Sequence, residues 1–293
     1  MDLVEQCVGR FCLRLPSAMK RTSDAEEVQG VTLEEVAWDK SAKDPWEHEW
    51  LARLKKIEAM KSRREIPTAA YGEIVEQLML KPGKLKAAFY CPSASRKRTA
   101  LGAIYNAGHA GLWLEILTGE SKKDEAAKRI SEISAAYRPD EPGAARPKGA
   151  FHLPRGAVAA PFKLAEEAEV HFKGGPLDLE LVFALETVFE RDDQGLMSRF
   201  AEMMENSGVV AAGAGLRPLR SRARKMAGLD GEEIILLGSQ DGDGSLYFQW
   251  KTPGEEKSGK HPRINVIMRG SDGQKDEKIA FWDATLDSAK PAP

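Results

Sequence analysis

The chain is poor in the residues that build metal centres. Its 293 residues include only three cysteines and five histidines. No Cys-x-x-Cys occurs and no two histidines stand four residues apart, so the spacings typical of zinc sites are missing. We therefore expect no metal site. Three cysteines allow one disulfide and one free thiol, or three free thiols.

Long apolar runs are also missing. No stretch approaches the roughly 18 apolar residues of a membrane-spanning helix, so we expect no integral membrane segment. The first residues, MDLVEQC, lack the basic and then apolar pattern of a signal peptide. Two interpretations follow: a cytoplasmic protein, or the mature form of an exported one.

Neither sign of charge dominates the sequence. It has 43 Lys and Arg against 45 Asp and Glu, for a net charge of −2, whereas nucleic-acid-binding domains are usually strongly basic. Positive charge concentrates locally in SRKR at 95–98 and in RPLRSRARK at 217–225. We favour a solvated strand face for the second cluster; contact with nucleic acid, a membrane or an acidic protein partner are alternatives.

Hydrophobic residues (42%) and charged residues (30%) are at the levels of a globular protein, and the length suggests about two domains. Periodicity predicts four helices, at 44–62, 120–138, 193–208 and 275–290. Asp44 and Pro45 suit the start of the first, and Gly208 suits the end of the third. Strand-like segments are predicted at 3–15, 30–38, 84–91, 98–107, 110–119, 168–174, 177–189, 220–228, 232–239, 246–252 and 263–270.

The order of these elements predicts an α+β fold. Strands run together without regular βαβ alternation, which favours mainly antiparallel sheets, each with one or two helices on it. The segment 139–149 has three prolines and no periodicity, so we interpret it as a linker. This predicts an N-terminal α+β domain at 1–138 and a C-terminal α+β domain at 150–293, with a cleft between them.

Residues 3–15 alternate as a single strand would. In that arrangement Cys7 shares a face with Phe11 and Leu13, and Cys12 lies on the opposite face. The five-residue spacing then prevents Cys7 and Cys12 from holding one ion together. Pro16 ends the strand, because it cannot donate to the ladder.

The sequence contains no complete catalytic or cofactor-binding motif of the common types. SQDGDGS at 239–245 starts like a calcium loop, but its sixth and twelfth positions would be Leu246 and Thr252, so a hairpin turn explains it better. GAG at 213–215 lacks the third glycine of a dinucleotide loop, and no Gly-x-Ser-x-Gly occurs. We therefore expect no catalytic residues and no cofactor, and favour a binding protein.

Two stretches together resemble a known family. The first is the opening strand Cys-x-Gly-Arg-Phe that ends in Leu-Pro. The second combines Ala-Gly-x-x-Gly-Glu-Glu, an aromatic-x-Trp strand, Pro-Arg-Ile and Trp-Asp-x-x-Leu-x-Ser. The residues that carry these motifs are Cys7, Gly9, Arg10, Phe11, Leu15, Pro16, Ala227, Gly228, Gly231, Glu232, Glu233, Phe248, Trp250, Pro262, Arg263, Ile264, Trp282, Asp283, Leu286 and Ser288. In this order they resemble the immunity proteins that neutralise lipase effectors of the bacterial type VI secretion system.

The resemblance implies a periplasmic protein that binds and inhibits a cognate phospholipase effector. It implies that two domains grip the lipase and block its lid or active-site entrance, with no catalytic residue in the inhibitor. Gly9 and Gly228 would serve backbone geometry, and Trp250 and Trp282 would fill the core. The alternatives are a cell-envelope adaptor with another protein partner, and an enzyme of unrecognised family that uses the cleft.

Partner contacts usually lie on loops, so we place them in the linker region around 147–161 and at the hairpin tips 241–245 and 255–261. The candidate residues are Pro147, Arg155, Asp241, Asp243, Ser245, Glu255, Lys257 and His261. In an oxidising periplasm, a disulfide from Cys7 to Cys91 is the pairing we consider; otherwise these cysteines are small buried apolar residues.

Overall fold

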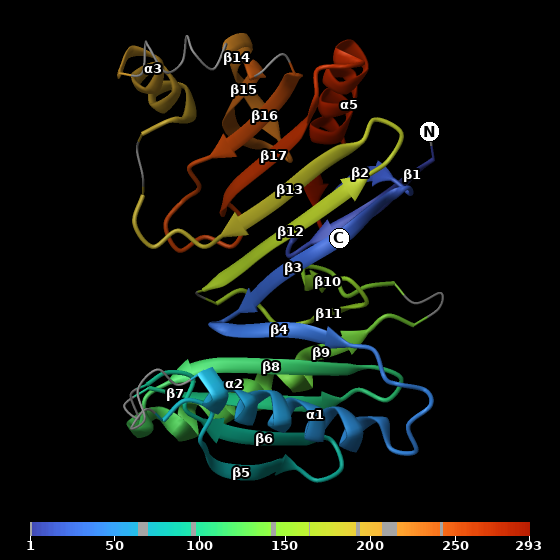
Figure 1. Ribbon diagram of the computed structural model, residues 1–293, viewed down its shortest axis with the longest axis vertical. Helices are drawn as coiled ribbons and strands as arrows, with labels where there is room; N and C mark the ends of the chain where they lie inside the picture. The colour runs from blue at the N-terminus through green and yellow to red at the C-terminus, as the bar shows by residue number, and fades with distance from the viewer. Residues whose placement is uncertain are drawn as a thin grey trace. The chain divides into compact units, whose positions relative to one another are not determined.

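The computed structural model describes residues 2–63, 70–94, 98–141, 145–163, 165–191, 194–206, 216–240 and 243–293. The chain folds into two compact units (Figure 1). Unit 1 comprises Met1–Ala25 and Phe162–Pro293, and unit 2 comprises Glu26–Pro161. This division differs from the boundaries at 1–138, 139–149 and 150–293 that the composition suggested.

The difference arises because the two ends of the chain fold together. The hairpin of β1 (Leu3–Val8) and β2 (Phe11–Pro16) pairs with the final strand β18 (Lys290–Pro291). The backbone N–H of Arg14 donates to Oγ of Ser288 over 2.9 Å, although the two residues are 274 positions apart. Contacts over such a separation leave no local signal in the sequence.

The predicted linker lies within unit 2. Its first residue belongs to β9 (Tyr137–Pro139), which pairs with β11 (Gly156–Val158), and β11 pairs in turn with β10 (Phe151–Leu153). Arg146 Nε donates to Asp140 Oδ1 over 2.8 Å. The described part of 139–149 is therefore a connection inside one unit.

Unit 1 is built on a sheet with strand order β14-β15-β16-β17-β13-β12-β3. The strands are β3 (Met19–Val28), β12 (Glu166–Gly174), β13 (Leu179–Glu186), β14 (Arg217–Met226), β15 (Leu229–Gln240), β16 (Asp243–Thr252) and β17 (Arg263–Ser271). The pairings from β14 through to β12 are antiparallel. β3 begins in unit 1 and ends in unit 2.

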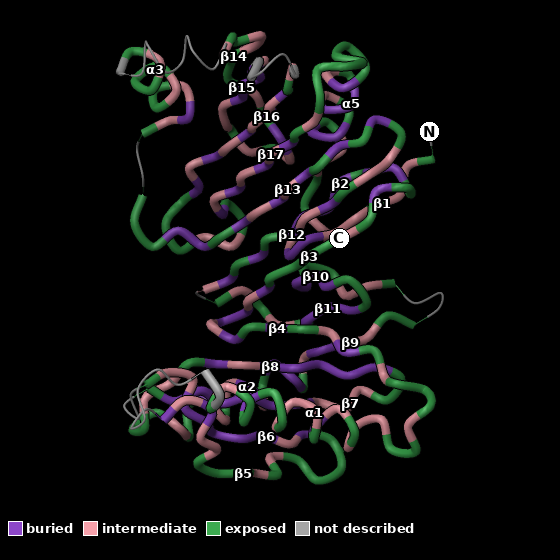
Figure 2. Tube along the Cα trace, in the orientation of Figure 1, coloured by how far each residue is buried: buried purple, intermediate pink, exposed green. Residues whose placement is uncertain are grey.

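Alternation along these strands creates two different faces, and Figure 2 shows buried and less buried residues following one another along β13 and β17. We call one the closed face; it carries Phe183, Phe248 and Val266, all at most 1% exposed. Helix α5 (Lys275–Ser288) covers it, with the Trp282 ring 5.5 Å from that of Phe248.

The other side, the open face, carries the intervening residues. Helix α3 (Leu196–Asn206) lies over it at β15, where Leu196 packs with Ile234 and Leu236. Farther along the sheet, β12, β13 and β17 present mainly exposed and half-buried residues on this side.

Unit 2 has strand order β3-β4-β8-β7-β6-β5. Its strands beyond β3 are β4 (Val31–Val36), β5 (Ile74–Lys81), β6 (Leu85–Tyr90), β7 (Thr99–Asn106) and β8 (Gly111–Thr118). Helix α1 (Pro45–Ala59) buries Trp50 and Ile57 against Ile104 and Trp113 of the sheet. Helix α2 (Lys123–Ala136) buries Ala126, Ile130, Ile133 and Ser134. Short 3-10 turns, Met60–Arg63 and Glu120–Lys122, follow α1 and precede α2.

All four predicted helices are present, and the α+β class with antiparallel sheets is confirmed. Helix α1 begins as expected: Asp44 accepts a hydrogen bond from the Glu47 N–H over 3.0 Å, and Pro45 occupies the first helical position. Gly208, the predicted end of α3, lies outside the described residues.

Candidate protein-binding surfaces

The eight predicted contact residues fall in separate places. Pro147 and Arg155 belong to unit 2, and the others belong to unit 1. Asp241 lies outside the described residues, Asp243 begins β16, and Ser245 is exposed on β16. The loop after β16, residues 253–262, holds the rest. Since β16 is ten residues long, the hairpin tip and this loop lie at its opposite ends, about 30 Å apart.

The β16–β17 loop is closed by its own hydrogen bonds. The Glu255 N–H donates to the His261 carbonyl over 2.7 Å, and the two side chains approach to 2.6 Å. The Lys257 N–H donates to the Val188 carbonyl over 2.8 Å. Glu255, Lys257 and His261 are all exposed. The structure therefore brings these three predicted residues together on one ordered loop.

Arg155 lies at the β10–β11 turn, which is fastened by a buried carboxylate. The Arg155 N–H donates to Glu35 Oε2 and the Tyr137 hydroxyl donates to Oε1, each over 2.6 Å. Burial raises the pKa of Glu35 above its ordinary value, although the hydrogen bonds from Tyr137 and Arg155 oppose this. Burial, and then the Glu35 carboxylate, raise the pKa of Tyr137. The Arg155 side chain itself is 54% exposed.

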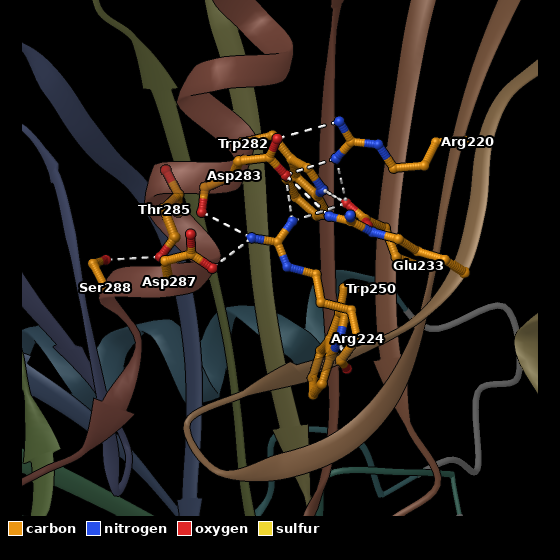
Figure 3. Close-up of polar contacts among 10 residues, drawn as sticks. Arg220, Arg224, Glu233, Trp250, Trp282, Asp283, Thr285, Asp287 and Ser288 are labelled. Atoms are coloured by element: carbon orange, nitrogen blue, oxygen red, sulfur yellow. Dashed lines mark hydrogen bonds and ion pairs between the residues drawn. The ribbon is translucent and has the colours of Figure 1, made fainter.

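The basic cluster at 217–225 lies on a strand that is largely exposed, as the sequence pattern suggested, but its alternating arginines are paired within the fold. Arg220, Arg222 and Arg224 of β14 lie on the closed face and converge on Glu233 of β15, which is fully buried. Figure 3 shows Arg220 and Arg224 beside Glu233. Arg222 pairs directly with Glu233 across the two strands, and the other arginines flank it. The sequence pattern marked the arginines, but their carboxylate partner is brought in by strand pairing.

Glu233 accepts hydrogen bonds on both oxygens. Oε1 receives Arg224 Nη1 at 3.1 Å, Arg220 Nη1 at 3.3 Å and Trp282 Nε1 at 2.6 Å. Oε2 receives Arg222 Nε at 2.6 Å. A buried carboxylate is tolerated when its lone pairs are satisfied in this way.

The arginines are also paired from the side of α5. Asp283 accepts Arg220 Nη1 at 2.7 Å and also binds Arg224, whose Nη2 reaches Asp287 at 2.6 Å (Figure 3). Burial opposes ionisation of Asp283, but the hydrogen bonds from Arg220 and Arg224 outweigh it and hold its pKa below the ordinary value. Arg220, Arg222 and Arg224 are therefore paired within unit 1 and serve the fold.

The opening motif also serves the fold. Gly9 turns the chain between β1 and β2 with a φ of +55°. Arg10 then forms a bidentate pair with Glu166 of β12, at 2.7 Å from Nε and 2.6 Å from Nη2. Glu166 is only 4% exposed. This pair attaches the hairpin to the closed face of the sheet.

The prediction of a disulfide between Cys7 and Cys91 is wrong, because Cys7 is bonded to Cys12. Residues 3–16 form a hairpin rather than one strand, so Cys7 and Cys12 are directly opposite, with Cα atoms 4.0 Å apart, and are joined by a disulfide. Cys91 is buried and takes part in no disulfide within the described structure. The turn at Gly9 reverses the chain, which overrides the argument that a five-residue spacing separates Cys7 from Cys12.

One cluster of metal-type side chains occurs among the described residues: Glu5, Cys7 and Cys12. Two of its members are consumed by the disulfide, which leaves a single carboxylate. The cluster therefore does not make a metal site. Within the described residues there is also no helix long and apolar enough to cross a membrane.

Comparison with known proteins now decides the family. The family described as Tle cognate immunity protein 4 C-terminal domain matches residues 138–293, more than half of the chain. The chain belongs to this family. It is thus an immunity protein rather than an enzyme, as the resemblance implied. No curated protein matches this immunity protein in sequence.

Solved structures share the fold of the whole immunity protein. The apo immunity protein TplEi of the type VI secretion system of Pseudomonas aeruginosa is 18% identical, with a TM-score of 0.77 over 99% of this chain and 97% of that chain. A chain of the Tle4–Tli4 complex is also 18% identical, with a TM-score of 0.78 over 100% of this chain and 99% of that chain. TplEi complexed with "L" peptide gives a TM-score of 0.75.

The motifs of this immunity protein have structural roles. Ala227 and Gly228 have φ values of +53° and +83° and form the two-residue turn between β14 and β15. A side chain at Gly231 would collide with the Trp250 ring. Trp250 and Trp282 are fully buried, as predicted. Trp250 and Trp282 therefore serve the closed face, whereas Arg263 of the same motifs lies on the open face.

Proposed function

We propose that this chain binds a cognate type VI phospholipase effector in a stoichiometric complex and inhibits it. The observation that carries the proposal is the family match over 138–293. The solved Tle4–Tli4 complex supports it, because one of its chains shares the fold. Gripping of the effector by two domains, with its lid or active-site entrance covered, stays an expectation from the family resemblance.

The proposal places the protein in the periplasm. Its Cys7–Cys12 disulfide supports this location, because disulfides persist in oxidising compartments such as the periplasm and are rare in the cytosol. Labelling of free thiols in protein recovered from periplasmic and cytoplasmic fractions tests the location. We expect Cys7 and Cys12 to resist labelling until the protein is reduced, and recovery in the cytoplasmic fraction with both thiols free would contradict it.

The inhibition is tested with the phospholipase effector that we expect to be encoded beside this gene. At an equimolar ratio the purified chain should abolish phospholipid hydrolysis, and the two proteins should co-elute at 1:1 in gel filtration. An unrelated phospholipase provides the control and should keep full activity. Undiminished hydrolysis by the neighbouring effector would reject the proposal for that pair.

The predicted contact residues remain part of this proposal. Three alanine blocks separate them: Pro147 with Arg155, the hairpin-tip residues 241–245, and Glu255 with Lys257 and His261. The third block has the strongest support, because the structure gathers its residues on one ordered, exposed loop. Affinity for the effector ranks the three regions. Unchanged affinity for all of them would exclude these loops as contacts.

A further inference from the structure

The open face of unit 1 contains a hollow of about 330 Å³. Its walls come from β12, β13, β16 and β17, together with Arg199 of α3. Lys251 and Arg263, which line it, flank the β16–β17 loop that carries Glu255, Lys257 and His261, and none of these three lines the hollow itself. The ionisable residues that line it are Glu167, Glu169, Glu186, Arg199, Lys251 and Arg263.

The cationic side of the hollow contains an unpaired ammonium. Lys251 is half-buried, and among the described residues its Nζ has neither a hydrogen bond nor an ion pair. Burial, followed by the positive charges of Arg199 and Arg263, lowers the pKa of Lys251. Arg263 Nη1 binds Glu186 over 2.8 Å, while its buried Nε has no partner within the described structure. The free protein thus holds donors here without acceptors.

The acidic side contains a carboxylate, that of Glu167, without a cationic partner among the described residues. Glu167 of β12 and Glu186 of β13 are direct cross-strand partners, an arrangement in which like charges destabilise a sheet. Partial burial, and then the charges of Glu186 and Glu169, raise the pKa of Glu167. Glu169 contacts His171 over 2.9 Å.

A partner with the complementary charges would pair both Lys251 and Glu167. We propose that this hollow is a docking site for a segment of the effector that places an acidic side chain against Lys251 and a basic side chain against Glu167. This inference rests on the proposed function and identifies a surface that it uses. Electrostatic complementarity of this kind selects the partner and fixes its register.

The width of the hollow favours a protein segment over a small ion or a lipid headgroup. Lys251 and Glu167 lie on strands separated by three strand spacings, or about 14 Å. Two side chains on one protein segment can span that separation, whereas a single phosphate or headgroup cannot reach both charges. The hollow also carries acids and bases in equal number, which does not favour a purely anionic ligand.

The test uses the full chain and its effector, with affinity measured by titration calorimetry. Lys251→Glu and Glu167→Lys should each weaken binding by about ten- to hundredfold, and Lys251→Arg should bind like the wild type. Lys275→Glu is the matched control and should not change affinity. Lys275 is exposed and is the first residue of α5, the helix that covers the closed face, so it does not line the hollow. Thermal unfolding of each variant verifies folding, and Lys251→Met provides an uncharged second variant.

The outcomes separate the two proposals. A wild-type chain that forms no complex with the effector overturns the proposed function and this site with it. A wild-type complex that both charge reversals leave within about twofold overturns the docking site alone. Binding of the wild-type chain to phosphatidylethanolamine vesicles that Lys251→Glu abolishes, with effector affinity unchanged, would show a lipid site instead and also overturn it.

Discussion

The two faces of the sheet in unit 1 differ in whether their ionisable side chains are paired. On the closed face, Glu233 is fully buried and accepts bonds from three arginines and Trp282. On the open face, Lys251 is half-buried and Glu167 is exposed, and both are unpaired within the described structure. A completed network stabilises a fold, whereas an incomplete one is available to a partner. The difference suggests which face builds the protein and which face binds.

The strongest way to break this comparison is to remove Glu233. Glu233→Gln should lower the free energy of unfolding by about 3–5 kcal/mol, because it leaves buried arginine charge without its carboxylate. Urea denaturation followed by tryptophan fluorescence measures this loss. Glu180→Gln on the open face is the control, since its pair with Lys173 is solvent-exposed and should contribute nothing measurable. Equal effects of the two substitutions would contradict the distinction between the faces.

The hairpin that covers the closed face depends on its cross-link. Replacing both Cys7 and Cys12 with alanine should destabilise the protein by about 2 kcal/mol, the value expected for a loop this short. Thermal unfolding with and without reductant measures the effect. Reductant should destabilise the wild type to the same extent and leave the double variant unchanged. A wild type insensitive to reductant would show that the disulfide contributes no stability.

Acid should weaken the closed face through Asp283. The folded pKa of this carboxyl lies below its ordinary value of 3.8, so its contribution is fully present above that value. The contribution is lost as the pH falls below 3.8 through the lowered folded pKa. The loss should be smaller than that from the disulfide, because Asp283 is 33% exposed and solvent screens its pairs. Unfolding between pH 5 and pH 2, compared with Asp283→Asn, measures it; identical pH profiles would exclude this role.

The smallest effect is expected on the open face. Lys251→Met should change the free energy of unfolding by no more than about 0.5 kcal/mol, because the substitution breaks no hydrogen bond or ion pair among the described residues. The same denaturation assay measures it, with Lys275→Met as the control. A loss of stability comparable to that of Glu233→Gln would mean that Lys251 stabilises the fold.

Prediction from sequence succeeded for features with local causes. Asp44 and Pro45 start α1 where the capping pattern placed it, and the antiparallel α+β class followed from the order of elements. The two tryptophans of the motifs, Trp250 and Trp282, are buried as expected. The start of α1 depends on neighbours within a few residues. Burial of the two tryptophans follows from their large apolar side chains.

Prediction failed where distant segments meet. A single positive-φ turn at Gly9 makes a hairpin of residues 3–16 and joins Cys7 to Cys12. The arginines of 217–225 were visible, but their pairing with Glu233 and Asp283 depends on strand register and on a helix some 60 residues away. The two compact units differ from the predicted boundaries for the same reason, because the chain termini fold together.

Local periodicity and the order of elements thus predicted the class of fold and its helices, and the ordered motifs carried the resemblance to the family. The pairing of charges, the disulfide and the placement of the open face came from packing in three dimensions. Local propensities act over one or two turns of chain, whereas a buried charge is satisfied by whichever strand or helix the topology brings beside it. Lys251 and Glu167 illustrate this: in the sequence they are ordinary surface residues, and the order of strands leaves them without partners.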